Sequence, residues 1–246
     1  MSVPPELFDE DYLFFYADVL APERSSADAD LTARLLGLRT GQRVLDVPCG
    51  EGRIAGRLAQ RGVEVVGLDS SELFLRRARG EWPSVTFVHG DMRELPYGDE
   101  FDAVLNWFTG FGYFDRETND AVLAGFARAL RPGGRLLLEM HNPGRLARLV
   151  ALAGGESAYV IDRDGALMVD RIRYDPGEGF SHTTRHIIRD GQVRTLQFTL
   201  EQIPAPELVR RLQAAGFGAV ECYGAGGERY DPEGRRLIAV AERASS

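Results

Sequence analysis

The sequence predicts an α/β protein built on a doubly wound, mostly parallel sheet. Between residues 43 and 141, short apolar segments of strand length alternate with segments in which apolar residues recur at helical spacing. This alternation is typical of a parallel sheet with helices on both faces. At residues 159–203 the rhythm changes, because turn sequences such as Asp190-Gly191 separate four extended segments. That stretch predicts an antiparallel β-meander inserted into the α/β unit.

Helices and strands outside the alternating region can also be placed. Residues 9–20 read as a first helix with an acidic start, and Ser26 can cap a second helix that stops at Gly37. A helix at 116–130 ends in a proline–glycine stop signal. A helix at 205–215 and strands at 219–223 and 237–240 complete the main sheet. We therefore expect an N-terminal helical cap (1–40), a core (41–158 and 204–246) and an inserted meander (159–203) for substrate specificity or dimerisation.

Composition narrows the class of protein. The chain has 246 residues, 44% of them hydrophobic, which is enough for one sizeable domain. A net charge of −8 disfavours nucleic acid as a partner. With only Cys49 and Cys222, no signal sequence at residues 1–6 and no apolar run of membrane length, we expect a cytoplasmic protein without membrane contact.

Lysine is absent from the sequence, because all 29 basic residues are arginine. Schiff-base chemistry, attachment of pyridoxal phosphate and a P-loop lysine are therefore excluded. The tyrosine–lysine pair that many short-chain reductases use is excluded for the same reason.

Glycines and carboxylates follow the predicted strands at places that suit a nucleoside ligand. Gly50 and Gly52 form a turn after the first strand, where a ligand can approach the backbone closely. Asp69 closes the second strand and can accept both ribose hydroxyls, and Asp91 follows the third, where it could accept an adenine amino hydrogen. Gly50, Gly52 and Ala55 also satisfy a relaxed dinucleotide-binding pattern, so a nicotinamide cofactor stays an alternative.

These motifs together resemble the class I S-adenosylmethionine-dependent methyltransferases. The resemblance rests on D-x-x-C-G-x-G at 46–52, the acid that closes the second strand and the Gly-Asp pair after the third, and it continues through 101–104 and 130–138. It implies a Rossmann-like fold, S-adenosylmethionine as cofactor and S-adenosylhomocysteine as product. Pro48 departs from the family pattern, and we expect it to stiffen the turn. The expected cofactor-binding residues are Arg24, Asp46, Pro48, Cys49, Gly50, Gly52, Asp69, Ser70, Asp91, Met92, Asn106 and Phe108.

The acceptor is expected to lie against residues 106–114. This segment carries five aromatic residues within eight positions, and aromatic faces attract cations such as a sulfonium or an amine. Nucleic-acid amino-methyltransferases have an Asn/Asp-Pro-Pro-aromatic motif at this position. This chain lacks both prolines of that motif, so we favour a small metabolite as the acceptor. The segment resembles that of bacterial small-molecule N-methyltransferases, including those acting on amino sugars and glycine. Phe111 and Tyr113 are the expected substrate residues.

Methyl transfer from a sulfonium requires alignment above all, and His141 and Tyr16 are the candidate catalytic residues. His141 ends the fifth strand, where a neutral imidazole near its ordinary pKa could accept the acceptor's proton. A structural role for His141 and a base role for Glu139 are the alternatives. The resemblance places Tyr16 in a lid over the cofactor. His182 and His186, four residues apart in a strand, would lie roughly 13 Å apart, too far to share a zinc ion, so we expect no metal.

The sequence thus predicts an enzyme that transfers a methyl group from S-adenosylmethionine to a nitrogen or oxygen of a small molecule. A homodimer is one assembly that the meander could form. An NAD(P)-dependent oxidoreductase is a rival, although it does not explain Gly90-Asp91-Met92. A non-catalytic S-adenosylmethionine-binding protein and an aminopropyltransferase are two others. Titration with S-adenosylmethionine, S-adenosylhomocysteine and NADPH would distinguish these functions.

Overall fold

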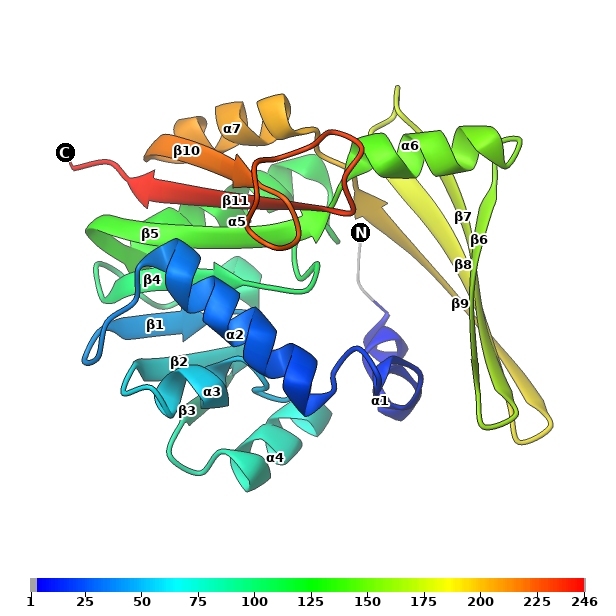
Figure 1. Ribbon diagram of the computed structural model, residues 1–246, viewed down its shortest axis with the longest axis horizontal. Helices are drawn as coiled ribbons and strands as arrows, with labels where there is room; N and C mark the ends of the chain where they lie inside the picture. The colour runs from blue at the N-terminus through cyan, green and yellow to red at the C-terminus, as the bar shows by residue number, and fades with distance from the viewer. Residues whose placement is uncertain (1–3, 246) are drawn as a thin grey trace.

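The computed structural model describes residues 4–245 and contains two sheets (Figure 1). Residues 1–3 lie outside the described residues. They belong to the expected N-terminal cap and to the segment in which no signal sequence was predicted. The main sheet has seven strands in the order β10-β11-β5-β4-β1-β2-β3. Its strands are β1 (Arg43–Asp46), β2 (Glu64–Asp69), β3 (Thr86–His89), β4 (Phe101–Asn106), β5 (Leu130–His141), β10 (Phe217–Tyr223) and β11 (Arg236–Arg243).

Strands β1 to β5 pair in parallel, whereas β11 runs antiparallel to β5 and β10 antiparallel to β11. The strand order reverses between β1 and β4, and open α/β sheets bind ligands at such a switch point, beyond the carboxyl ends of the strands. Val44 and Leu45 of β1 are completely buried, because helices cover both faces of the sheet.

Two hydrophobic clusters, one on each face, show that the sheet is doubly wound. One face is covered by α2 (Pro22–Leu36), α3 (Ala55–Ala59) and α4 (Glu72–Glu81), and the other by α5 (Arg116–Ala129) and α7 (Ala205–Ala214). Short 3₁₀ turns occur at Pro5–Leu7 and Met92–Glu94. Among residues 4–245, no helix is both long and apolar enough to cross a membrane.

The second sheet is an antiparallel meander in the order β6-β7-β8-β9 (Figure 1). Its strands are β6 (Ser157–Arg163), β7 (Ala166–Asp175), β8 (Phe180–Arg189) and β9 (Gln192–Glu201). The predicted fold class, an α/β sheet with an inserted antiparallel meander, is thereby confirmed. Tyr159, Val160 and Val193 are exposed on the meander. Its use as a dimer surface stays a prediction.

Helix α1 (Glu10–Tyr16) lies between the two sheets (Figure 1). Phe15 packs against the meander residues Met168 and Ile187. Ion pairs join the same helix and its N-cap to the meander, with Asp11 2.8 Å from Arg189 and Asp9 2.6 Å from Arg194. On the other side Glu10 pairs with Arg77 of α4. These contacts fasten α1 to both sheets.

Three local features differ from the sequence-based expectation. Helix α2 begins at Pro22, several residues before Ser26, because proline suits the first turn of a helix. Strand β5 includes the segment 130–134, which was expected to be a stop and turn; Gly133, with φ of +77°, accommodates the irregularity. Helix α6 (Pro143–Leu152), capped by Asn142, links β5 to the meander where no helix was expected.

Candidate functional site

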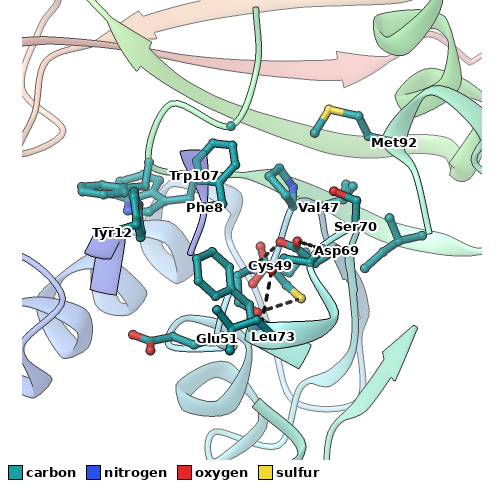
Figure 2. A pocket seen from close by; sticks show the side chains of 18 of the residues that line it. Phe8, Tyr12, Val47, Cys49, Glu51, Asp69, Ser70, Leu73, Met92 and Trp107 are labelled. Atoms are coloured by element: carbon teal, nitrogen blue, oxygen red, sulfur yellow. Dashed lines mark hydrogen bonds between the residues drawn. The ribbon is translucent and has the colours of Figure 1, made fainter. Parts of the chain in front are cut away.

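A cavity of about 630 Å³ lies beyond the carboxyl ends of β1 and β2, at the switch point of the sheet (Figure 2). This volume is within the range of sites for small molecules. The walls come from the segment before α1, the glycine turn, the ends of β2 and β3, and the loop after β4. Ten of the residues expected from the sequence line it: Asp46, Pro48, Cys49, Gly50, Asp69, Ser70, Asp91, Met92, Phe108 and Tyr113.

Asp69 links the end of β2 to the glycine turn. Its carboxylate accepts hydrogen bonds from the backbone N–H of Gly50 at 2.7 Å and of Ser71 at 2.8 Å (Figure 2). A carboxylate has about four lone-pair positions, so two stay available for the hydroxyls of a ribose. Burial raises the pKa of Asp69, and these backbone amides oppose the rise.

The glycine turn brings backbone close to the cavity. Gly50 and Gly52 have φ of +55° and +75°, and a Cβ on Gly52 would lie 2.7 Å from the ring of Phe87. Gly52 therefore contacts the protein interior and does not line the cavity. The Val47–Pro48 peptide bond is cis. Gly50 and Asp69 fit the nucleoside of the cofactor that the resemblance implies, whereas Gly52, also expected at the cofactor, shapes the turn from inside.

Asp46 is almost completely buried below the turn. Burial raises its pKa to about 8, against the opposing charge of Arg53 and a hydrogen bond from the backbone of Ala55. Asp46 therefore ionises less readily than an exposed carboxyl group.

Asp91 follows β3 and faces the cavity in company with Arg93. The Arg93 guanidinium donates to both Asp91 oxygens, with Nη2 2.6 Å from Oδ2. That pairing lowers the pKa of Asp91. An adenine amino group at this position would share the carboxylate with Arg93.

Arg53 is a cavity residue that sequence reasoning did not single out. Its Nη1 donates to Asp28 at 2.8 Å, and its guanidinium lies 5.1 Å from the centre of the Phe108 ring. Nη2 is buried and has no hydrogen-bond partner within the described chain. An arginine directly after a G-x-G turn is the sequence signal that could have identified it, because the turn places it above β1.

Aromatic rings from three parts of the chain line the cavity, and Phe198 from a fourth packs against one of them. Phe8 lies 5.5 Å from Tyr12 and 5.7 Å from Tyr113, measured between ring centres. Phe74 of α4 lies 5.7 Å from Tyr12, and Phe198 of β9 lies 6.5 Å from Tyr113. Burial raises the pKa of Tyr12 and of Tyr113, so both phenols are neutral at physiological pH. We call Phe8, Tyr12, Phe74, Tyr113 and Phe198 the aromatic cage.

Tyr16 does not line the main cavity but lies beside the cage. Its ring is 4.8 Å from that of Tyr12 and 6.3 Å from that of Phe108. Its hydroxyl accepts a hydrogen bond of 3.1 Å from Arg185 of the meander. Arg185 in turn forms a buried two-pronged ion pair with Asp170, at 2.7 and 2.8 Å. This network connects the meander to the aromatic cage through Tyr12, and no sequence pattern predicted it.

Asn106 and Phe111, predicted to contact ligands, are buried beneath the cavity. Asn106 is completely buried, and its amide donates to the carbonyl oxygen of Val47 at 2.8 Å. Phe111 is 1% exposed and belongs to the hydrophobic core. Both support the loop after β4 from below.

His141 has an exposed side chain at the end of β5, outside the lining of the main cavity. The protein around it disfavours the imidazolium and, with the positive charges of Arg236 and Arg235, lowers its pKa to about 3. The expectation that His141 has a pKa near its ordinary value is therefore wrong. The imidazole is neutral at physiological pH and weakly basic.

Glu139, two residues before His141, is a buried anchor for the loop after β4. One carboxylate oxygen accepts from the backbone N–H of Thr109 at 2.9 Å, and the other lies 3.0 Å from Nε of Arg236. Arg236 also donates to the Thr109 hydroxyl at 2.8 Å. Phe108 and Thr109 have φ of +64° and +58°, a strained backbone for non-glycine residues. The buried ion pair holds this strained turn.

Arg24, expected at the cofactor, lines a separate cavity of about 200 Å³. The two cavities share Trp107 and Phe108 as lining residues.

Among residues 4–245, no group of three or more His, Cys, Asp or Glu side chains is placed to hold a metal ion. The two histidines of the meander have different partners: His182 lies 3.3 Å from Glu178, and His186 lies 3.0 Å from the Thr195 hydroxyl.

Comparison with known proteins adds to this geometry. Residues 44–134 match a family model described as a methyltransferase domain. An uncharacterized methyltransferase from Synechocystis is 32% identical over 171 residues, 66% of this chain and 77% of that protein. The dTDP-3-amino-3,6-dideoxy-α-D-glucopyranose N,N-dimethyltransferase of Streptomyces fradiae is 30% identical over 208 residues, 79% of this chain and 75% of that enzyme. The structure of an amino pentose methyltransferase from Micromonospora echinaspora, with S-adenosylmethionine bound, has a TM-score of 0.68 at 21% identity and covers 99% of both chains.

Proposed function

This chain belongs to the family of S-adenosylmethionine-dependent methyltransferases, and from that premise we propose that it methylates a nitrogen or oxygen of a small-molecule acceptor. Its cofactor is S-adenosylmethionine. The observation that carries the proposal is the aromatic cage, which borders the same cavity as Asp69 and the glycine turn. Neutral rings around that space favour an amine over an anionic group at the reacting atom of the acceptor.

The cofactor supplies an activated methyl group, which passes in line to a lone pair of the acceptor while the C–S bond breaks and its electrons stay on sulfur. Asp69 and the glycine turn would hold the nucleoside, and the cage would direct the acceptor at the methyl group. Alignment of this kind is the main contribution a protein can make to such a displacement. The acceptor's proton leaves to water, because His141 lies outside the main cavity and its imidazole is only weakly basic. We propose no metal in this route.

An amino sugar is the acceptor class that we favour. The relatives named above include a dTDP-amino-sugar N,N-dimethyltransferase, which covers 79% of this chain. In this chain the phenols of Tyr12 and Tyr113 line the main cavity and would contact such an acceptor, while Tyr16, held by Arg185, packs beside Tyr12.

The experiment is to incubate the protein with S-adenosylmethionine and matched sugar nucleotides that carry either an amino group or a hydroxyl group at one ring position. We expect S-adenosylhomocysteine to form with the amino compound, unchanged by a chelator, and mass spectrometry to show added methyl groups on nitrogen. The Tyr113→Leu variant, which removes a cage ring, should bind S-adenosylhomocysteine normally but lose turnover. Equal turnover with the hydroxyl compound would contradict the preference for an amine, and a need for added metal would contradict the metal-free route.

A further inference from the structure

The second cavity lies beside the main one, with Trp107 and Phe108 as common walls. Its volume of about 200 Å³ is below the usual range for a complete small-molecule site. It therefore suits one chemical group at the end of a ligand whose remainder occupies the main cavity.

Charge in the second cavity is unbalanced. It is lined by three arginines and two carboxylates: Arg24, Arg235, Arg236, Asp28 and Glu139. Both carboxylates already have cationic partners, since Asp28 pairs with Arg53 at 2.8 Å and Glu139 with Arg236 at 3.0 Å. Arg24 and Arg235 are exposed and make no side-chain hydrogen bond or ion pair within residues 4–245. Two positive charges are thus left to face a ligand.

The same positive charge acts on His141 at the end of β5. Arg236 pairs with His141 across β11 and β5. The surrounding protein and then the charges of Arg236 and Arg235 lower the pKa of His141. The two guanidinium groups therefore act at the rim of the sheet where the acceptor is expected.

We propose that the second cavity binds a phosphoryl group of the methyl acceptor, held by Arg24 and Arg235. The inference rests on the proposed function, because it requires the acceptor to occupy the main cavity. Arginine forks bind phosphate oxygens in a two-pronged geometry. A phosphate monoester carries about −1.5 to −2 charges at neutral pH, and the diphosphate of a sugar nucleotide carries about the same in total, which balances two arginines, whereas a single carboxylate balances only one.

The cofactor's methionine carboxylate is the competing source of anionic oxygen. Arg53 lines the main cavity and carries a guanidinium nitrogen without a partner in the described chain. The methionine carboxylate of the cofactor can thus pair with Arg53 in the main cavity. Arg24 and Arg235 are then left for the acceptor.

The test is a calorimetric titration of inorganic pyrophosphate into protein saturated with S-adenosylhomocysteine. Wild type is compared with Arg24→Gln/Arg235→Gln and with the control Arg39→Gln/Arg76→Gln, which removes two exposed arginines that lack side-chain partners in residues 4–245. We expect wild type and control to bind pyrophosphate alike and Arg24→Gln/Arg235→Gln to bind at least tenfold more weakly. The affinity of all three proteins for S-adenosylhomocysteine should agree within twofold. If the double variant does not fold, the two single variants replace it, each with at least a threefold loss.

Three results would overturn the inference. Pyrophosphate binding that is absent from wild type, or equal in Arg24→Gln/Arg235→Gln, would show that the cavity holds no phosphoryl group. A loss of S-adenosylhomocysteine affinity in that variant would assign the arginines to the cofactor. Tighter binding of succinate than of pyrophosphate would assign the cavity to carboxylates. None of these titrations involves methyl transfer, so the inference can fail while the turnover assay still supports the proposed function.

Discussion

At the scale of single residues, the carboxylate of Asp69 contributes both to the fold and to the proposed function. Two of its lone-pair positions accept the backbone amides of Gly50 and Ser71, which fixes the glycine turn against the end of β2. The positions that are left face the cavity. The same side chain therefore shapes the turn and is available to the cofactor.

Replacement of Asp69 by alanine should weaken cofactor binding by at least tenfold. Each charge-assisted hydrogen bond to a ribose hydroxyl contributes roughly 1.5–3 kcal/mol, and the variant loses two. Calorimetry with S-adenosylhomocysteine measures the loss, and circular dichroism checks that the fold persists. Asp69→Asn, which keeps one carbonyl oxygen, should lose less. Unchanged affinity in Asp69→Ala would show that the nucleoside binds elsewhere.

His141 should make stability depend on pH in a defined direction. Its pKa of about 3 in the folded protein lies below its ordinary value of 6.5, so the unfolded chain binds the proton more readily. The stabilising contribution is complete above pH 6.5 and is lost as pH falls toward 3. In urea unfolding, wild type should lose stability relative to His141→Gln between pH 7.5 and pH 5. A difference that stays constant over this range would contradict the lowered pKa.

At the scale of elements, the loop after β4 shows how a buried charge can hold a strained turn. Two consecutive non-glycine residues with positive φ are stable there because Glu139 and Arg236 bind the backbone and hydroxyl of Thr109. Phe108, which lines both cavities, sits on this turn.

Removal of the Glu139 carboxylate should destabilise the protein and displace the loop. Glu139→Ala leaves Arg236 without its partner, and breaking a buried pair costs about 3–5 kcal/mol of unfolding free energy. Glu100→Ala is the matched control, because its pair with Arg43 is about one-third exposed on both sides and should be worth at most about 1 kcal/mol. Urea unfolding measures both variants. Equal losses would show that Glu139 is not an anchor.

The strand ends were predictable from the sequence, and the long-range pairs were not. Asp46, Asp69 and Asp91 could be placed on one rim because parallel strands all end on the same side of a sheet. Alternating aromatics in 107–114 did not reveal that Phe111 points into the core while Phe108 lines the cavity, since the positive φ of Phe108 and Thr109 breaks the register. The contact of Tyr16 with Arg185 depends on how the meander folds back over α1.

At the scale of the whole molecule, the meander is one continuous segment that packs beside the proposed acceptor side of the site. Phe198 contributes to the cage, and Arg185 binds Tyr16. Apart from Arg53, the groups proposed to hold the nucleoside and methionine parts of the cofactor come from the strand ends of the main sheet. We therefore propose that residues 159–203 determine acceptor specificity.

Replacement of residues 159–199 by a glycine–serine linker should separate the two halves of the reaction. We expect affinity for S-adenosylhomocysteine within about tenfold of wild type, because Asp69 and the glycine turn stay, and loss of acceptor turnover. Glu201 is kept because it is buried and pairs with Arg211 of α7 at 2.9 Å. A shortened protein that folds but binds no S-adenosylhomocysteine would refute the assignment.

The position of α1 has a kinetic consequence. The helix and the segment before it line the main cavity, and ion pairs with partly exposed side chains fasten them to the meander and to α4. Dissolved salt weakens such pairs. The residence time of S-adenosylhomocysteine should therefore shorten as ionic strength rises, and stopped-flow displacement can measure it. Arg194→Gln should release the product faster already at low salt and respond less to added salt. The rate at which the enzyme clears its product would then depend on charge pairs that touch no reacting atom.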